Sequence, residues 1–278
     1  MKTPVKSLVF ALCCASLASV TAQADAPPRR IVSVNLCTDQ YLLALADRSQ
    51  IAALTSNADK PEMSAAAAQA HGLRLLGQSA EDVLDIAPDL IIGMPARSSA
   101  LVAALRGQQY RTLDMHWADS LDDIKAQIRA VASAVGHPDR GKALIARMEH
   151  ELAALPKPGH GRVAAYYQRR GFLTGTGTLV DDLMSRAGLV NLAARLHKPA
   201  LSQISIESMI AAQPDFIIVE TETDRVTDQG TEMLHHPALE HIARIHIPQA
   251  WTVCGGPAYV QAARSLVAQV AAAQSSGH

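Results

Sequence analysis

The chain has 278 residues, of which 49% are hydrophobic, so it is long enough to bury a large core. Its 25 basic and 26 acidic residues give a formal net charge of −1, and no run of Lys or Arg resembles a nucleic-acid footprint. These features exclude nucleic acid as the partner, and beyond the N-terminus no segment is apolar over the roughly 20 residues that a membrane span needs.

The first 24 residues have the pattern of a secretory signal peptide. Two lysines precede an apolar run from Leu8 to Ala18, and small residues lead up to Asp25. The apolar run is too short for a membrane anchor. We therefore expect cleavage after Ala24, with Ala26 as the alternative, export to the periplasm and a soluble, monomeric mature protein.

A first α/β lobe is predicted for residues 29–119. A buried strand at 30–34 is followed by the polar loop 35–39 and then by a helix, which makes the first strand-loop-helix unit. The helix of this unit is predicted at 40–47. The elements predicted after it are a strand at 51–54, an alanine-rich helix at 64–70, a helix at 98–106, a strand at 111–115 and a closing loop at 116–119.

A helical segment, residues 120–158, follows the first lobe. Ser120 is the predicted cap of a first helix, which Gly136-His137-Pro138 interrupts. A second helix is predicted over residues 139–155, because its apolar residues recur every three or four positions: Leu144, Ile145, Met148 and Leu152. A helix of about 17 residues spans roughly 25 Å, so it should act as a stiff strut between lobes and allow little closure.

The second lobe is predicted for residues 162–274 and repeats the order of elements of the first. It begins with a strand at 162–167. The elements that follow are a glycine-rich turn at 171–177, a helix at 178–187, a helix at 231–243, a short strand at 245–247, the run 251–253, a loop at 254–257 and a final alanine-rich helix to about Ala273.

An internal repeat relates the two lobes. Residues 81–92 (EDVLDIAPDLII) and 207–218 (ESMIAAQPDFII) each predict a short helix, a Pro-Asp turn and an apolar strand. The copies lie too far apart for a solenoid repeat, and their separation is about that of a domain. The repeat predicts an α/β fold of two similar lobes with mostly parallel sheets, joined by a single long helix, with a ligand cleft between the lobes.

Aromatic and basic residues follow the predicted strands at the cleft. The pair His116-Trp117 ends the first lobe, where an imidazole and an indole could stack on a flat ligand. In the second lobe, strand alternation sends Tyr166 and Tyr167 to opposite faces, so that one packs in the core and the other faces a ligand. Next come Arg169 and Arg170, which either meet carboxylates or amides of a ligand or remain solvated.

Two cysteines, Cys37 and Cys254, remain after the signal peptide. In an oxidising compartment they could pair, and the bond would then link one lobe to the other. The alternatives are two buried small hydrophobic residues or two residues that line the cleft.

Catalytic motifs are absent from the sequence, and we expect no enzymatic activity. There is no Gly-x-Ser-x-Gly elbow and no His-Glu-x-x-His helix, and the glycines at 171–177 lack the lysine and the spacing of a phosphate loop. We also expect no metal site on the protein, because His235-His236 lies at a helix boundary and His241 and His246 are poorly spaced. A direct metal-ion binder that uses His116 and an acid of the other lobe is the alternative.

Taken together, several segments resemble the periplasmic solute-binding proteins of ABC importers for vitamin B12 and iron-siderophore complexes. The resemblance covers essentially the whole mature chain and implies two α/β lobes joined by one long helix. The matching segments are Arg30-Ile31-Val32-Ser33, residues 87–92 (APDLII), the helix at 139–155, residues 174–179 (TGTGTL) with 187–191 (AGLVN), and Ser205-x-Glu207 with Pro214-Asp215.

The resemblance also implies where the ligand and the permease bind. In this family the ligand lies between the lobes, and the inner-membrane permease docks on a glutamate of each lobe. In this chain the docking glutamate of the second lobe corresponds to Glu207. The docking position of the first lobe falls near Ala70, which is not a glutamate, and this leaves Glu62 as a substitute. The implied ligand-binding residues are Asn35, Cys37, Thr38, Asp39, Pro95, Arg97, His116, Trp117, Tyr166, Tyr167, Arg169, Arg170, Cys254, Gly255, Gly256 and Tyr259.

The ligand class that the resemblance implies is a metal chelate, without protein atoms necessarily bound to its metal. A corrinoid needs a broad slot lined by apolar groups and amides with an aromatic edge, whereas anionic siderophores would favour several arginines in the cleft. We therefore favour a corrinoid such as vitamin B12, with a ferric siderophore or haem as the alternative.

Overall fold

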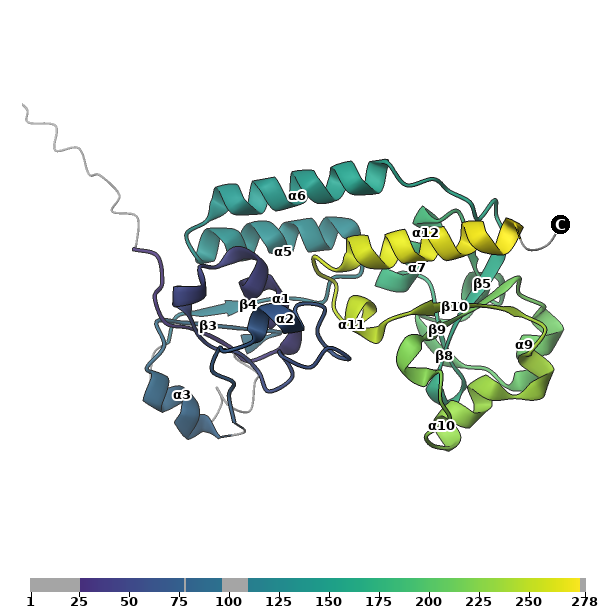
Figure 1. Ribbon diagram of the computed structural model, residues 1–278, viewed down its shortest axis with the longest axis horizontal. Helices are drawn as coiled ribbons and strands as arrows, with labels where there is room; N and C mark the ends of the chain where they lie inside the picture. Colours follow the sequence, from purple (N-terminus) through teal and green to yellow (C-terminus); the bar gives the residue numbers. More distant parts are fainter. Residues whose placement is uncertain (1–25, 78, 97–109, 276–278) are drawn as a thin grey trace, which may run out of the picture.

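The computed structural model describes residues 26–77, 79–96 and 110–275. The expected signal peptide, Arg97 and the helix expected at 98–106 lie outside these residues. The fold is α/β and two-lobed, and helices α5 (Leu121–Ala134) and α6 (Pro138–Ala153) lie over the first lobe and extend toward the second (Figure 1). In the part of the chain that the structure describes, no helix is long and apolar enough to cross a bilayer.

The first lobe is built on a four-stranded parallel sheet with the order β2-β1-β3-β4. Its strands are β1 (Ile31–Ser33), β2 (Ile51–Ala53), β3 (Leu90–Gly93) and β4 (Thr112–Asp114). Among the described residues of this lobe, the helices are α1 (Leu36–Leu45), η1 (Arg48–Gln50), α2 (Ala67–Ala70) and α3 (Ala80–Ile86).

The second lobe has a six-stranded sheet with the order β10-β9-β5-β6-β8, and β7 (Val190–Asn191) pairs with β5 off this path. Strands β5 (Val163–Gln168), β9 (Phe216–Glu220) and β10 (Ala243–Ile247) are parallel, whereas β6 (Phe172–Thr174) and β8 (Leu201–Gln203) are antiparallel. The helices are η3 (Arg169–Gly171), α7 (Leu179–Arg186), α8 (Leu192–Arg195), α9 (Ile206–Ala212), η4 (Thr221–Thr223), α10 (Gln229–Glu232), η5 (Met233–His235), η6 (Pro237–Leu239), α11 (Gln249–Thr252) and α12 (Tyr259–Ser275).

The sequence repeat is confirmed as a structural repeat. Both α3 and α9 end on a non-glycine residue in the left-handed region, Ala87 with φ 46° and Gln213 with φ 44°. The aspartate of each Pro-Asp turn then accepts a hydrogen bond from the backbone where the lobe's first strand begins. Asp89 Oδ1 accepts from Arg30 N at 2.9 Å, and Asp215 Oδ2 accepts from Val163 N at 2.7 Å. The repeated motif therefore fastens β3 beside β1 and β9 beside β5.

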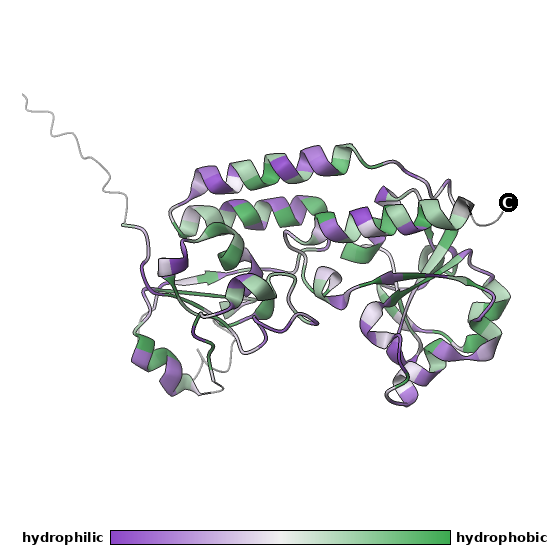
Figure 2. Cartoon of the chain, viewed as in Figure 1, coloured by the Kyte–Doolittle hydropathy of each residue, from purple (hydrophilic) through white to green (hydrophobic). Residues whose placement is uncertain are grey.

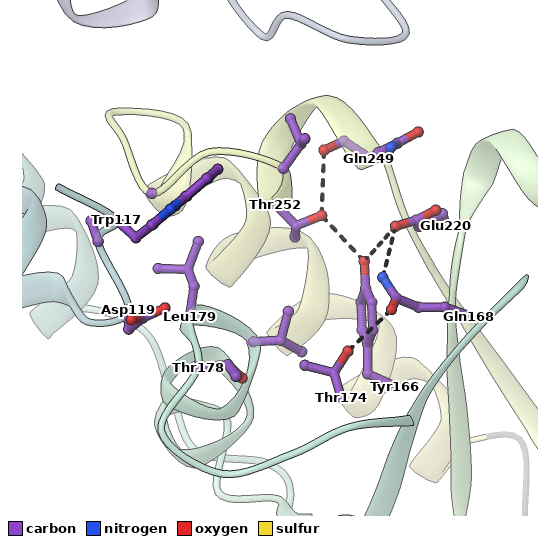
Figure 3. Close-up of a pocket in the computed structure, with 14 residues that line it drawn as sticks. Trp117, Asp119, Tyr166, Gln168, Thr174, Thr178, Leu179, Glu220, Gln249 and Thr252 are labelled. Atoms are coloured by element: carbon purple, nitrogen blue, oxygen red, sulfur yellow. Dashed lines mark hydrogen bonds between the residues drawn. The ribbon is translucent and has the colours of Figure 1, made fainter. Parts of the chain in front are cut away.

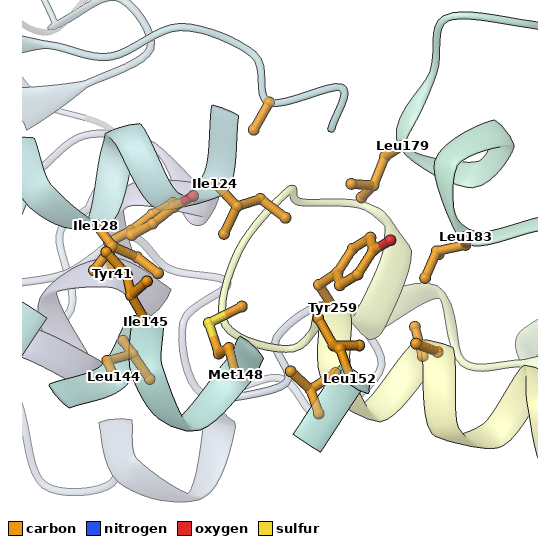
Figure 4. Packing of buried hydrophobic residues seen from close by; sticks show 14 of the residues in the cluster. Tyr41, Ile124, Ile128, Leu144, Ile145, Met148, Leu152, Leu179, Leu183 and Tyr259 are labelled. Atoms are coloured by element: carbon orange, nitrogen blue, oxygen red, sulfur yellow. The ribbon is translucent and has the colours of Figure 1, made fainter. Parts of the chain in front are cut away.

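Helix α6 (Pro138–Ala153) corresponds to the strut that the sequence predicts at 139–155, and α5 (Leu121–Ala134) packs beside it. Along both helices, apolar residues recur between polar ones (Figure 2), and the four apolar residues expected on one face of α6 are buried. In the core, Met148 and Leu152 lie between Tyr41 and Ile124 on one side and Tyr259 and Leu183 on the other (Figure 4). Because one core cluster includes residues of both lobes and of the strut, the strut is packed and not a free linker.

Four predicted elements differ in the structure. Residues 36–39 form the first turn of α1 and not a loop, because the Asn35 side chain caps the helix by accepting from Cys37 N at 2.8 Å. The helix expected at 231–243 is three short pieces, because Pro237 disfavours helical backbone at His236, which is extended. Part of the glycine-rich turn is strand β6, and the run 251–253 falls mostly in helix α11.

Candidate ligand-binding cleft

A cavity of about 270 Å³, open to solvent, lies beyond the carboxyl ends of β5 and β9. This is where ligands of α/β sheets bind, because loops and helix starts meet there. Figure 3 shows Trp117 and Asp119 on one side of the cavity and Tyr166, Gln168 and Glu220 on the other. The lining residues are Trp117, Ala118, Asp119, Tyr166, Gln168, Thr174, Thr178, Leu179, Val180, Glu220, Gln249, Thr252, Val253 and Gly255.

One wall of the cavity is a hydrogen-bonded network around the end of β5. The Tyr166 hydroxyl donates to Glu220 Oε1 at 3.3 Å, and Gln168 Nε2 donates to the same oxygen at 3.3 Å. Thr252 Oγ1 lies 3.2 Å from the Tyr166 hydroxyl. Burial raises the pKa of Tyr166, which is 2% exposed, and burial also raises the pKa of Glu220. The network holds these side chains in fixed positions at the cavity wall.

The opposite wall comes from the segment that joins the first lobe to α5. Trp117 is 67% exposed, which leaves most of its indole available to a ligand. The segment is anchored on both sides of Trp117, because Gln127 Nε2 donates to the carbonyl of His116 and Ser120 caps α5 through Asp123 N. The backbone is therefore fixed while the indole surface stays open.

A disulfide joins Cys37 to Cys254, which lies between the lining residues Val253 and Gly255, and the two Cα atoms are 5.2 Å apart. Of the alternatives for these cysteines, pairing is the one that the structure shows. Beside it, the Tyr41 hydroxyl donates to the carbonyl of Gly255 at 2.6 Å. A Cβ on Gly255 would lie 2.4 Å from the carbonyl oxygen of Ala118, so only glycine allows this close approach. The disulfide thus ties α1 to a loop that lines the cavity.

Among the residues expected to bind a ligand, Trp117, Tyr166 and Gly255 line the cavity. His116 is exposed beside Trp117, Pro95 is exposed after β3, and Gly256 is buried against Tyr41. Neither of the two arginines lines the cavity. Arg169 forms an ion pair with Asp228, and Arg170 lies, in left-handed backbone with φ 59°, at a separate hollow.

Six expected ligand-binding side chains are buried away from the cavity, and each has a structural partner. Cys37 and Cys254 form the disulfide. Thr38 and Asp39 point into the first lobe because α1 begins earlier than expected. Thr38 bonds to Ser33, and Asp39 accepts from Thr55.

The expected residues of the second lobe also have structural partners. Strand alternation places Tyr167 in a separate core cluster of that lobe, on the face of β5 opposite to Tyr166, as the sequence predicts. In α12, the Tyr259 hydroxyl donates to Asp182 and accepts from Arg186. Asn35 is occupied as the cap of α1.

Several lining residues are not among those that the sequence analysis names individually: Gln168, Thr174, Thr178, Glu220, Gln249 and Thr252. A signal was present for two of them. Glu220 ends the strand of the second repeat copy, and Gln168 ends β5, so the rule that ligands lie beyond strand ends would have identified both. The remaining four come from β6, the start of α7 and α11, whose positions depend on tertiary packing.

Metal-ligating side chains are not gathered at this cleft. Among the described residues, no group of three or more His, Cys, Asp or Glu is placed to hold a metal ion. His116 contributes its backbone carbonyl to the bond from Gln127, and its ring is not part of the cavity lining.

Comparisons with known proteins agree with this architecture. A family model described as periplasmic binding protein matches residues 31–244. A curated vitamin B12-binding protein of Pectobacterium carotovorum is 24% identical over 262 residues, which is 90% of this chain and 91% of the relative. The apo periplasmic heme-binding protein RhuT of Roseiflexus sp. RS-1 superposes with a TM-score of 0.71 at 28% identity, covering 88% of this chain and 98% of that one. The periplasmic vitamin B12 binding protein BtuF of Vibrio cholerae has a TM-score of 0.65 at 19% identity, with 89% and 98% covered.

Proposed function

Because this chain belongs to the periplasmic binding protein family, we propose that it captures a corrinoid of the vitamin B12 type and delivers it to an inner-membrane ABC permease. The family consists of solute-binding proteins and not of enzymes. The curated relatives named for vitamin B12 match about nine-tenths of the chain, which supports a corrinoid as the ligand.

The chemistry of the lining residues is the observation that carries this proposal. Amides and hydroxyls of Gln168, Gln249, Thr174 and Thr252 can bond to the amide groups that surround a corrin ring. Trp117 supplies a flat apolar surface. No Lys, Arg or His is among the described residues that line the cavity, and such cations are what the carboxylates of haem or of anionic siderophores require.

Haem is the second candidate, and it is favoured by a specific observation. The solved heme-binding protein of Roseiflexus shares more sequence with this chain than the vitamin B12 binding protein of Vibrio cholerae does, at 28% against 19% identity. Tyrosine is also among the known ligands of haem iron. Tyr166 is the tyrosine at this cavity, but both Glu220 and Thr252 already bond its hydroxyl.

We expect the mature protein to bind cyanocobalamin in a saturable, one-to-one manner with a Kd of about 1 µM or less. Calorimetry is the suitable measurement because corrinoids absorb the fluorescence of tryptophan. Haemin, a ferric hydroxamate, zinc and manganese are titrated in parallel. Loss of the exposed indole in Trp117→Ala should weaken binding by about tenfold. Leu201→Ala is the control, because it removes an exposed apolar side chain outside the cavity lining.

Tight binding of haemin or the hydroxamate without cyanocobalamin would overturn the corrinoid ligand while keeping a role in chelate uptake. A response to the bare ions alone would overturn chelate binding altogether. Equal affinities of wild type and Trp117→Ala would remove Trp117 from the site.

Delivery to a permease is the second half of the proposal, and we assign docking to Glu207 and Glu62. Glu207 is exposed in the first turn of α9, where a hydrogen bond from Ser205 lowers its pKa and keeps it charged. Glu62 is exposed on the first lobe. In vesicles that hold the partner permease, Glu207→Ala should reduce ligand uptake about threefold or more, since rim charges guide association. Uptake equal to wild type would contradict this role, and Glu232→Ala, also exposed, is the matched control.

A further inference from the structure

The Glu220 carboxylate lies at the cavity wall, and the protein's donors bond to only one of its two oxygens. Both donors that reach Glu220, the Tyr166 hydroxyl and Gln168 Nε2, bond to Oε1. Within the described part of the chain, Oε2 of Glu220 has no hydrogen-bond donor, although the residue lines the cavity. An oxygen without a protein donor at the wall of an open cavity can accept from a ligand, so Glu220 is placed to meet a donor or a cation.

The charged side chains among the described residues that line the cavity are acidic, which favours a ligand with positive charge. Asp119 and Glu220 line the cavity, and Glu222 lies beside it, accepting from Gln249 N at 2.8 Å. Of the nearby arginines, Arg169 acts electrostatically on Glu220 but does not line the cavity and is paired with Asp228, and Arg170 borders a different hollow. In the part of the cavity that the structure describes, negative side chains are therefore not balanced by positive ones.

We propose that Glu220 is a specificity-determining residue that favours corrinoids with a net positive charge over neutral corrinoids and over chelates that carry carboxylates. This inference rests on the proposed corrinoid function and states which net charge of the corrinoid the site selects. The physical basis is Coulomb attraction at a partly buried carboxylate, where the effective dielectric constant is below that of water. Two bonds donated to Oε1 hold Glu220 in place, so its charge is preorganised and needs little reorganisation on binding.

Aquacobalamin and cyanocobalamin provide a matched pair of probes. They share the corrin ring and its amides, but water in place of cyanide on the cobalt gives aquacobalamin one more positive charge. Calorimetric titrations of the mature protein are run with both probes at pH 7, at low and high salt, because burial raises the pKa of Glu220 and an acidic buffer would favour its neutral form. We expect wild type to prefer aquacobalamin by roughly three- to tenfold at low salt, with a smaller ratio at high salt.

Substitution isolates the contribution of Glu220. Glu220→Gln keeps the shape and an acceptor oxygen but removes the charge, and it should bring the ratio of the two affinities close to one. Glu240→Gln is the control, because Glu240 is exposed in the same lobe outside the cavity lining and its loss changes net charge equally. The absorption spectrum of the bound cobalt complex is recorded in each case, since a protein side chain that displaces the water would change it.

The outcomes separate this inference from the proposed function. Failure of both corrinoids to bind would overturn the proposed function. Equal binding of both probes by wild type, or the same preference in Glu220→Gln as in wild type, would overturn the selection by Glu220 and leave corrinoid binding intact. A changed spectrum with the preference retained in Glu220→Gln would assign the preference to ligation of cobalt, which also overturns it.

Discussion

Replacing Cys37 and Cys254 with serine together should lower the free energy of unfolding by about 2–4 kcal/mol, because the disulfide closes a very long loop of the chain. The bond joins residues 217 positions apart, so its loss frees the unfolded chain far more than a local bond would. Urea unfolding, followed by circular dichroism, measures the change. The variant should unfold at a lower urea concentration than the oxidised wild type.

Reductant provides the control for this experiment. Wild type treated with reductant should match the double serine variant, whereas the variant itself should not respond to reductant. Equal stability of oxidised wild type and the variant would show that the disulfide adds nothing beyond the packing of α1 against the loop at Gly255.

Replacing Asp39 with asparagine should remove a pH dependence of stability worth about 3 kcal/mol. Asp39 is fully buried, and burial raises its pKa from 3.8 to about 6. A raised pKa means that the folded state favours the protonated acid. The stabilising contribution is therefore fully present below pH 3.8 and is lost as the pH rises through about 6.

The measurement is the free energy of unfolding of wild type and Asp39→Asn between pH 4 and 7, taken as a difference so that other carboxylates cancel. The advantage of the asparagine variant should grow as the pH rises across the window set by this pKa. Asp85→Asn is the control, because Asp85 is exposed. A constant difference across this range would show that the Thr55 bonds fully compensate the buried charge.

The fold could be predicted from the sequence because its signals are local and repeated. The helix, Pro-Asp turn and strand occur twice, and each copy is fixed by contacts within a few residues and by one aspartate that bonds to the neighbouring strand. The burial of Met148 and Leu152 follows from helical periodicity in the same way. The opposite faces of Tyr166 and Tyr167 follow from the pleat of a strand.

The candidate cavity was only partly predictable, and the expected residues that lie away from it share a common cause. Polar residues at 37–39 suggested a loop facing the ligand, but one cap at Asn35 starts the helix earlier and turns Thr38 and Asp39 into the core. Tyr259 resembled a cleft residue, yet α12 packs against α7 and brings Asp182 and Arg186 to its hydroxyl. In each case, one hydrogen bond or one packing contact between distant segments redirected the side chain.

By itself, the sequence determined the α/β class, the repeated unit, the long strut and the edge of the sheets where a ligand would lie, because these depend on periodicity and short-range turns. Only the tertiary structure decided that Cys37 pairs with Cys254 and that Glu220, Gln168 and Thr252 surround Tyr166. Those contacts join segments tens to hundreds of residues apart, and pairings over such distances are set by the packing of whole elements, which local sequence patterns do not encode.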